Sequence, residues 1–141
     1  MQFKKIMVAT DFSPLSEKAI DYAVMTAKQF GATILLIHVL EPFPISTTDA
    51  LMFVDNSEAV REVAEAMIVN LREILNEKGV TVETGLIQGA PASEIVIKAS
   101  QEEVDLIVMG THGRKGVEHL LLGSVAEKVI RTAKCPVMIV P

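Results

Sequence analysis

The chain has a single cysteine, Cys135, no tryptophan, and an aromatic content of only 4%. One cysteine cannot form an internal disulfide, and the three histidines stand at no spacing typical of metal ligands. No apolar stretch approaches the roughly 20 residues that a transmembrane helix needs, and residues 1–5 are too few for a signal peptide. These absences lead us to expect a cytoplasmic protein that needs no disulfide, membrane span or structural metal.

Positive charge is also scarce, with 13 Lys and Arg against 18 Asp and Glu and a net charge of −5. An acidic domain is a poor partner for nucleic acid or for an anionic membrane surface. A phosphate can still bind, because backbone amides at a helix N-terminus and one or two cations suffice. The length of 141 residues fits one domain, so we expect residues 1–141 to share one core.

Apolar residues make up 50% of the chain, in short strand-like runs that alternate with helix-like segments. Strands are expected at residues 6–10, 33–40, 80–87, 105–109 and 136–140. Helices are expected at residues 14–30, 57–78, 91–102 and 124–133. Residues 41–56, with two prolines, two threonines and two aspartates, read as a loop. This alternation predicts an α/β fold, an open five-stranded parallel sheet in the order 3-2-1-4-5 with helices on both faces.

Two of these helices carry local signals in the sequence. Ser13 fits an N-cap before Pro14, and Gly31 fits the end of the same helix. The helix at 57–78 has one apolar side, made by Val60, Val63, Ala64, Met67, Leu71, Ile74 and Leu75. We expect that side to face the sheet.

The predicted strand order reverses direction between the first and the fourth strand. In open parallel sheets, ligands bind at this point, in the crevice outside the carboxyl ends of the strands. Thr10 and Asp11 follow the first strand, and Gly110 ends the fourth. We therefore predict a binding site made by these two segments.

The segment after the fourth strand is long and rich in glycine. Gly113 and Gly116 can adopt positive φ and turn amides inward, and Gly123 opens a helix whose free N–H groups attract an anion. A tight strand-to-helix connection would explain single glycines, but about thirteen residues exceed the usual ~4–6. The two common phosphate motifs, G-x-x-x-x-G-K-[ST] and G-x-G-x-x-G, are absent.

The spacing Gly110-x2-Gly113-x9-Gly123-Ser124 resembles the nucleotide motif of the ATP-binding branch of the universal stress protein family. The likeness covers the whole chain and is strongest at residues 5–13, 36–39, 105–113, 122–129 and 135–137. It implies a Rossmann-like fold and bound ATP, with AMP or ADP fitting the same pocket and Mg²⁺ or Mn²⁺ on the phosphates. One departure is Ala9, where family members often have proline, but the contact there is made by backbone and packing.

The resemblance also implies roles for individual residues. The phosphates would contact Gly113, Gly123, Ser124 and Val125. The ribose would lie near Met109 and Gly110, the nucleoside beside Ala9, Thr10 and Asp11, and the adenine edge at the backbone of Val39. The loop itself adds the backbone amide of His112, the turn at Gly116 and the charge of Arg114.

Asp11 has two readings, either a turn residue at a helix start or a ligand for ribose or for a water-bound divalent ion. His38 is expected to be a satisfied strand residue, His119 a solvated loop residue, and Cys135 a buried structural thiol. No Ser-His-Asp order, paired carboxylates or lysine nucleophile stands out, so rapid turnover is not expected.

We therefore predict an ATP-binding stress-response or signalling module. The alternatives are a slow ATPase or phosphoryl or nucleotidyl transferase, and a dimeric interaction protein with a non-functional nucleotide cradle. The last strand, Val137, Met138, Ile139 and Val140, is apolar and lies at an edge of the predicted sheet. Because such an edge must be covered or paired, we expect a homodimer through this strand.

Overall fold

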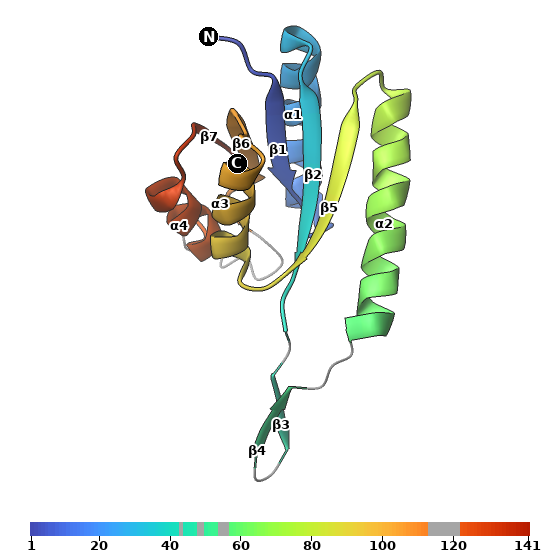
Figure 1. The fold of residues 1–141 in the computed structure, drawn as a ribbon, viewed down its shortest axis with the longest axis vertical. Coiled ribbons are helices and arrows are strands. Elements are labelled where there is room, and N and C mark those ends of the chain that lie inside the picture. The colour runs from blue at the N-terminus through green and yellow to red at the C-terminus, as the bar shows by residue number, and fades with distance from the viewer. Residues whose placement is uncertain (43, 48–49, 54–56, 113–121) are drawn as a thin grey trace.

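The computed structural model describes residues 1–42, 44–47, 50–53, 57–112 and 122–141 (Figure 1). Its main sheet has five parallel strands in the order β5-β2-β1-β6-β7. These strands are β1 (Lys5–Ala9), β2 (Thr33–Leu40), β5 (Val82–Gln88), β6 (Leu106–Gly110) and β7 (Val137–Val140). The predicted strand order 3-2-1-4-5 is confirmed, and so is the edge position of the alternating strand β5.

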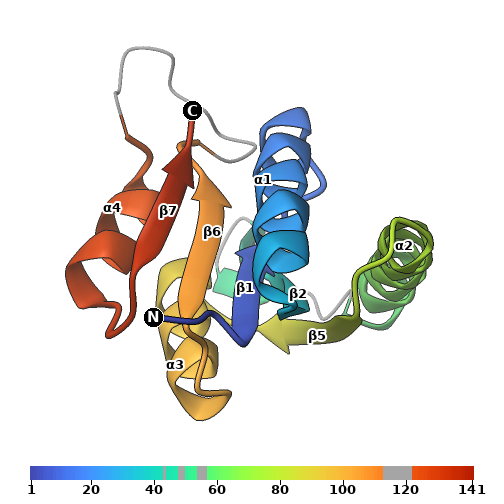
Figure 2. The same cartoon turned by 90° about the horizontal axis from the view of Figure 1, so that it is seen from above.

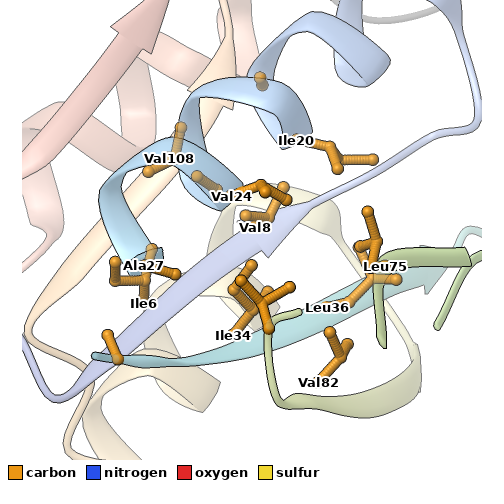
Figure 3. Close-up of a cluster of buried hydrophobic side chains, with 14 of the residues drawn as sticks. Ile6, Val8, Ile20, Val24, Ala27, Ile34, Leu36, Leu75, Val82 and Val108 are labelled. Carbon is orange, nitrogen blue, oxygen red and sulfur yellow. The ribbon is translucent and has the colours of Figure 1, made fainter. Parts of the chain in front are cut away.

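Two helices cover each face of the sheet. Figure 2 shows α1 (Pro14–Phe30) and α2 (Ser57–Glu77) on one side, and α3 (Pro91–Gln101) and α4 (Ser124–Thr132) on the other. Successive strand residues point to opposite faces, so Ile6 and Val8 of β1 enter the core under α1 and α2 (Figure 3), while Met7 enters the core under α3 and α4. The sheet is thus buried on both faces, as its near-continuous apolar strands require.

Helix α1 begins and ends where its capping residues stand. The Ser13 side chain accepts a hydrogen bond from the Ser16 N–H at 3.3 Å, and Pro14 occupies the first turn. Gly31 ends the helix with a φ of 68°, the left-handed conformation that glycine adopts without a steric penalty. Alanines at 19, 23 and 27 are fully or almost fully buried, which lets α1 pack closely on the sheet.

The apolar side predicted for α2 is only partly buried. Ala64, Ile68 and Leu75 face the core, whereas Val60, Val63, Met67 and Ile74 are 40–60% exposed. The helix lies beside the edge strand β5 (Figures 1 and 2), so the sheet covers only part of its apolar side. This leaves an apolar stripe at i, i+3, i+7 and i+14 on the outside of α2.

The prediction of a loop at residues 41–56 is wrong in part. Two short strands, β3 (Pro44–Thr47) and β4 (Ala50–Phe53), pair antiparallel within this segment, and the hairpin projects beyond the end of the main sheet (Figure 1). The prolines and aspartates indicated a loop, but residues 50–53 are all apolar and Pro44 stands at the first position of its strand, where proline is tolerated. In the part of the chain that the structure describes, no helix is long and apolar enough to cross a membrane.

Candidate functional site

The turn from β1 into α1 is built around the buried side chain of Thr10. The Thr10 N–H donates to the carbonyl oxygen of Ile37 in β2 at 2.9 Å, which extends the sheet by one bond. Its hydroxyl lies 3.0 Å from the Ser16 hydroxyl and accepts the N–H of Phe12, also at 3.0 Å. Because Ser16 already donates to Ser13, the Thr10 hydroxyl is the donor to Ser16. One hydroxyl therefore satisfies two groups of this turn.

Replacing Thr10 by valine keeps its shape but removes both hydrogen bonds. We expect the free energy of unfolding to fall by about 1–3 kcal/mol, since the partly buried Phe12 N–H loses its acceptor and the buried Ser16 hydroxyl loses its donor. Thr10→Ser keeps the hydroxyl and should lower the free energy of unfolding clearly less. Urea unfolding of the two variants and the parent measures the difference, and equal stability of Thr10→Val and Thr10→Ser would show that the hydroxyl network does not hold the turn.

Asp11 has the structural role that one of its two readings gave it. Its Oδ1 accepts the N–H of Ser13 at 2.9 Å, closing a short turn just before α1. The following residue, Phe12, has a φ of 63°, which is unusual for a bulky side chain. A ligand or metal role for the other carboxylate oxygen of Asp11 stays a prediction.

The structure brings the second segment of the predicted site to the same edge of the sheet. Strands β1 and β6 are hydrogen-bonded neighbours, with Val8 opposite Val108, so their carboxyl ends adjoin. Beyond β6 the chain returns to this edge at Gly123, whose N–H donates to the carbonyl oxygen of Thr111 at 2.7 Å. Thus the start of α4 lies beside the end of β6, and the end of β6 adjoins the end of β1, which Thr10 follows.

Glycine is required at position 123 by close backbone packing. A Cβ on this residue would stand 2.7 Å from the Thr111 carbonyl oxygen, closer than atoms in contact can be. Gly123 is also the N-cap of α4, and it has no side chain of its own to accept a hydrogen bond from the first N–H groups of that helix. At Gly110 a Cβ would come within 3.3 Å of the Leu15 carbonyl oxygen, so this glycine lets α1 pack against the end of β6.

Four more of the predicted site residues lie on one side of the sheet. Ala9, Val39, Met109 and Val125 all belong to the core under α3 and α4. Of the predicted nucleoside, ribose and adenine contacts, Ala9, Met109 and Val39 therefore share a face with the start of α4.

Three predicted site residues, Gly113, Arg114 and Gly116, lie outside the described residues, as does His119. His112 is partly buried, and its Nδ1 lies 3.1 Å from the Thr111 hydroxyl. Within the described ranges no group of three or more His, Cys, Asp or Glu residues could hold a metal ion.

His38 is a satisfied strand residue, as expected, but it also supports the candidate site. Its Nδ1 lies 2.7 Å from the Thr10 carbonyl oxygen, and its ring packs against Phe12 at 4.6 Å between centroids. The sequence showed only a histidine in an apolar strand, and nothing in the spacing pointed to a contact with Thr10, 28 residues earlier.

The ion pairs with shifted pKa values lie at the amino ends of the strands, away from the site. Lys5 pairs with Glu102 and Glu83, whose hydrogen bonds raise the lysine pKa, and hydrogen bonds from Lys98 and Lys5 lower the pKa of Glu102. Asp105 joins the same ends of β1 and β6 by accepting the backbone N–H groups of residues 4 and 5. These charged side chains therefore stabilise the amino ends of the strands and take no part in the candidate site.

Cys135 is a half-buried thiol between α4 and β7, and burial raises its pKa. A raised pKa means a smaller thiolate fraction at neutral pH, so we expect the folded protein to react with iodoacetamide more slowly than the same protein in urea. The rate should increase as the pH rises toward and beyond the ordinary thiol range. A folded-state rate equal to the rate in urea would contradict the structural role of this residue.

The fold defines a doubly wound α/β protein whose sheet has its switch point between β1 and β6. The model of the universal stress protein family matches residues 2–141, and the chain belongs to this family. A universal stress protein of Methanocaldococcus jannaschii is 40% identical over 98% of this chain and 82% of its own length. One from Bacillus subtilis is 36% identical over 98% of this chain and 99% of its own.

Two solved structures of the family contain an adenine nucleotide. The universal stress protein of Archaeoglobus fulgidus in complex with dAMP matches with a TM-score of 0.71 and 27% identity over 100% of both chains. A universal stress protein in complex with cAMP matches with a TM-score of 0.70 and 25% identity, over 99% of this chain and 98% of that one.

Proposed function

We propose that this protein binds an adenine nucleotide, most specifically ATP, in the crevice between the carboxyl ends of β1 and β6. The observation that carries the proposal is the contact between Gly123 and Thr111. It holds the start of α4, where the N-cap glycine has no side chain to accept a hydrogen bond, beside the end of β6, and β6 is the hydrogen-bonded neighbour of β1. A helix N-terminus favours a phosphate through its N–H groups and a partial positive charge of about +0.5.

The proposed contacts combine this placement of α4 with the residue roles that the loop sequence and the family resemblance imply. The phosphates meet Gly123, Ser124 and Val125 at the start of α4, together with Gly113, Arg114, Gly116 and the amide of His112. The ribose lies at Met109 and Gly110, and the nucleoside lies against Ala9, Thr10, Asp11 and the backbone of Val39. Relatives with dAMP and cAMP in their structures support an adenine nucleotide as the ligand. Mg²⁺ or Mn²⁺ would arrive with the phosphates of ATP, with Asp11 as its ligand through water.

We further propose that the bound ATP acts as a signal in a stress-response module rather than as a rapidly consumed substrate. Phosphoryl transfer needs firm metal ligands and a group that orients the attacking water or hydroxyl. In the described parts of the chain, Asp11 is the one carboxylate at the crevice, and one of its oxygens already holds the Ser13 N–H. Slow hydrolysis or transfer is the competing function, and phosphate release over hours would favour it.

The test is calorimetric titration of nucleotide-stripped protein with ATP and Mg²⁺, ATP alone, ADP and AMP. We expect micromolar or tighter binding of ATP and a loss of affinity as phosphates are removed, since the start of α4 would then lose its anion. The supernatant of denatured, unstripped protein is checked for carried-over nucleotide. No binding under any of these conditions, with none carried over, would favour the dimeric interaction protein with a non-functional cradle.

We also propose that two copies pair through the free edge of β7. This strand is apolar, is last in the sheet and pairs with β6 on one side only within the described residues. Unpaired edges of this kind are covered or paired in stable proteins.

A further inference from the structure

A cavity of about 340 Å³ lies between α2 and the end of β2. Its described lining residues are Phe12 from the turn after β1, His38 and Leu40 from β2, and Ala59, Val60, Val63, Ala64 and Met67 from α2. Small-molecule sites are typically of ~300–1,000 Å³, mostly apolar, with a few polar groups that orient the ligand. The cavity meets the first two conditions, and one polar side chain, His38, lines it.

This cavity is separate from the proposed nucleotide site. His38 and Leu40 alternate along β2 with Val39, so they share the face of Ile34 and Leu36 toward α1 and α2. Val39 belongs to the opposite core, under α3 and α4. A molecule in the cavity would therefore lie on the other side of the sheet from the start of α4.

Among the described lining residues, His38 is the one polar side chain, and its geometry fixes what it offers. Its Nδ1 lies 2.7 Å from the Thr10 carbonyl oxygen, and a carbonyl oxygen can only accept a hydrogen bond. The proton of the neutral ring is therefore on Nδ1, and Nε2 is an acceptor. The bond to Thr10 and the ring contact with Phe12 hold this acceptor in a fixed orientation.

The surroundings of the cavity select against charge. Apolar side chains cannot compensate a buried ion, so a charged ligand would lose its hydration without a partner. The exposed residues Glu58, Arg61 and Glu62 of α2 and Glu41 just beyond β2 flank the lining residues in sequence, and their net negative charge disfavours anions in particular.

We propose that this cavity is a second binding site of the protein, for a small, uncharged and mainly apolar molecule that donates one N–H or O–H hydrogen bond to Nε2 of His38. The exposed side chains of Val60, Val63 and Met67 in α2 form the wall that such a molecule would cover. The proposal does not depend on the proposed nucleotide function, because the two sites share no lining residue.

The probe is N-phenyl-1-naphthylamine, an uncharged aromatic molecule with one N–H donor whose fluorescence rises in apolar surroundings. We expect saturable binding with one probe per chain, and we expect saturating ATP to leave this binding in place. Displacement of the probe by ATP would put it in the nucleotide crevice and overturn the proposal, whereas failure of ATP to bind at all would leave the probe result intact.

A pair of variants on one helix localises the probe. Val63 lines the cavity and is 60% exposed, while Ile74 is 43% exposed on the same helix and is not a lining residue. Val63→Glu should weaken probe binding by at least about tenfold, since it brings a charge to an apolar wall, and Ile74→Glu should leave it unchanged. Equal effects of the two substitutions would overturn the proposal.

A second comparison tests the hydrogen bond to His38. His38→Phe keeps an aromatic ring but removes the acceptor, so the probe should bind about three- to tenfold more weakly. The hydrocarbon 1-phenylnaphthalene, which has no donor, should bind the parent and this variant equally. An equal loss for both molecules would overturn the assignment of Nε2.

Light scattering of Val63→Glu tests whether a second copy of the chain occupies the cavity instead. Conversion of an oligomer to monomers by this substitution would show that a second copy covers the cavity.

Discussion

Gly123→Ala is expected to abolish measurable nucleotide binding and to lower the free energy of unfolding by about 1–3 kcal/mol. The new methyl carbon would stand 2.7 Å from the carbonyl oxygen of Thr111, and neither group can rotate away, because the backbone fixes the position of the methyl carbon and the carbonyl oxygen is part of the backbone. The same two residues are joined by the Gly123 N–H bond of 2.7 Å, so relief of the clash also lengthens that bond. The start of α4 must then move away from the end of β6, and the proposed phosphate position moves with it.

The control for this variant is Ser124→Ala, one residue further into α4. Ser124 is exposed, and its replacement removes a hydroxyl without adding an atom near Thr111. We expect an unfolding free energy within about 0.5 kcal/mol of the parent and a reduced but measurable affinity for ATP. Calorimetry and urea unfolding measure both quantities. Parent-like ATP affinity in a stably folded Gly123→Ala would move the phosphate site away from α4.

The position of the candidate nucleotide site could be predicted from the sequence, because that prediction uses strand order alone. Alternation of strands and helices predicts a parallel sheet, and right-handed crossovers then place Thr10 and Gly110 at adjoining strand ends. The caps of α1 could also be predicted, since Ser13, Pro14 and Gly31 each favour a local backbone conformation. The first prediction follows from topology, and the second follows from interactions between residues a few positions apart along the chain.

Other features depend on contacts that no local pattern encodes. The clash that requires glycine at position 123 involves Thr111, twelve residues earlier, whereas the sequence pattern indicated only that Gly123 opens a helix. The support of the Thr10 turn by His38 crosses 28 residues. The hairpin of β3 and β4 could not be predicted, because turn-forming residues alternate with its two short strands and indicated a loop.

Helix α2 shows the limit of periodicity as a source of structure. The repeat of apolar residues along it predicted a buried side, and Ala64 and Leu75 are indeed buried. Periodicity does not tell how wide a surface the neighbouring elements present, however, and α2 lies at the edge strand β5. Of the exposed residues, Val60, Val63 and Met67 line the cavity, and their exposure is for that reason the most informative departure from the sequence prediction.

Ile139→Pro is expected to convert the proposed dimer to a monomer while leaving the sheet intact. The carbonyl oxygens of Pro136 and Val140 accept N–H groups from the β6 side, at 3.0 and 3.2 Å. Hydrogen-bonding directions alternate along a strand, so residues 136, 138 and 140 face β6, and the N–H groups of Val137 and Ile139 point to the free edge. Proline at 139 removes one of these outward donors and adds a ring where the partner strand would lie, without removing a bond to β6.

The matched control is Ile139→Ala, because Ile139 also packs against the core under α3 and α4. Alanine loses that packing but keeps the N–H, so this variant should be less stable than the parent and still dimeric. Sizing with light scattering over a range of concentrations gives the mass, and thermal unfolding shows whether each variant is folded. A dimeric Ile139→Pro would place the contact between copies on another surface, and a parent that is monomeric at high micromolar concentration would exclude the dimer itself. If both variants become monomers, the packing of the Ile139 side chain is the determinant instead of the free edge of β7.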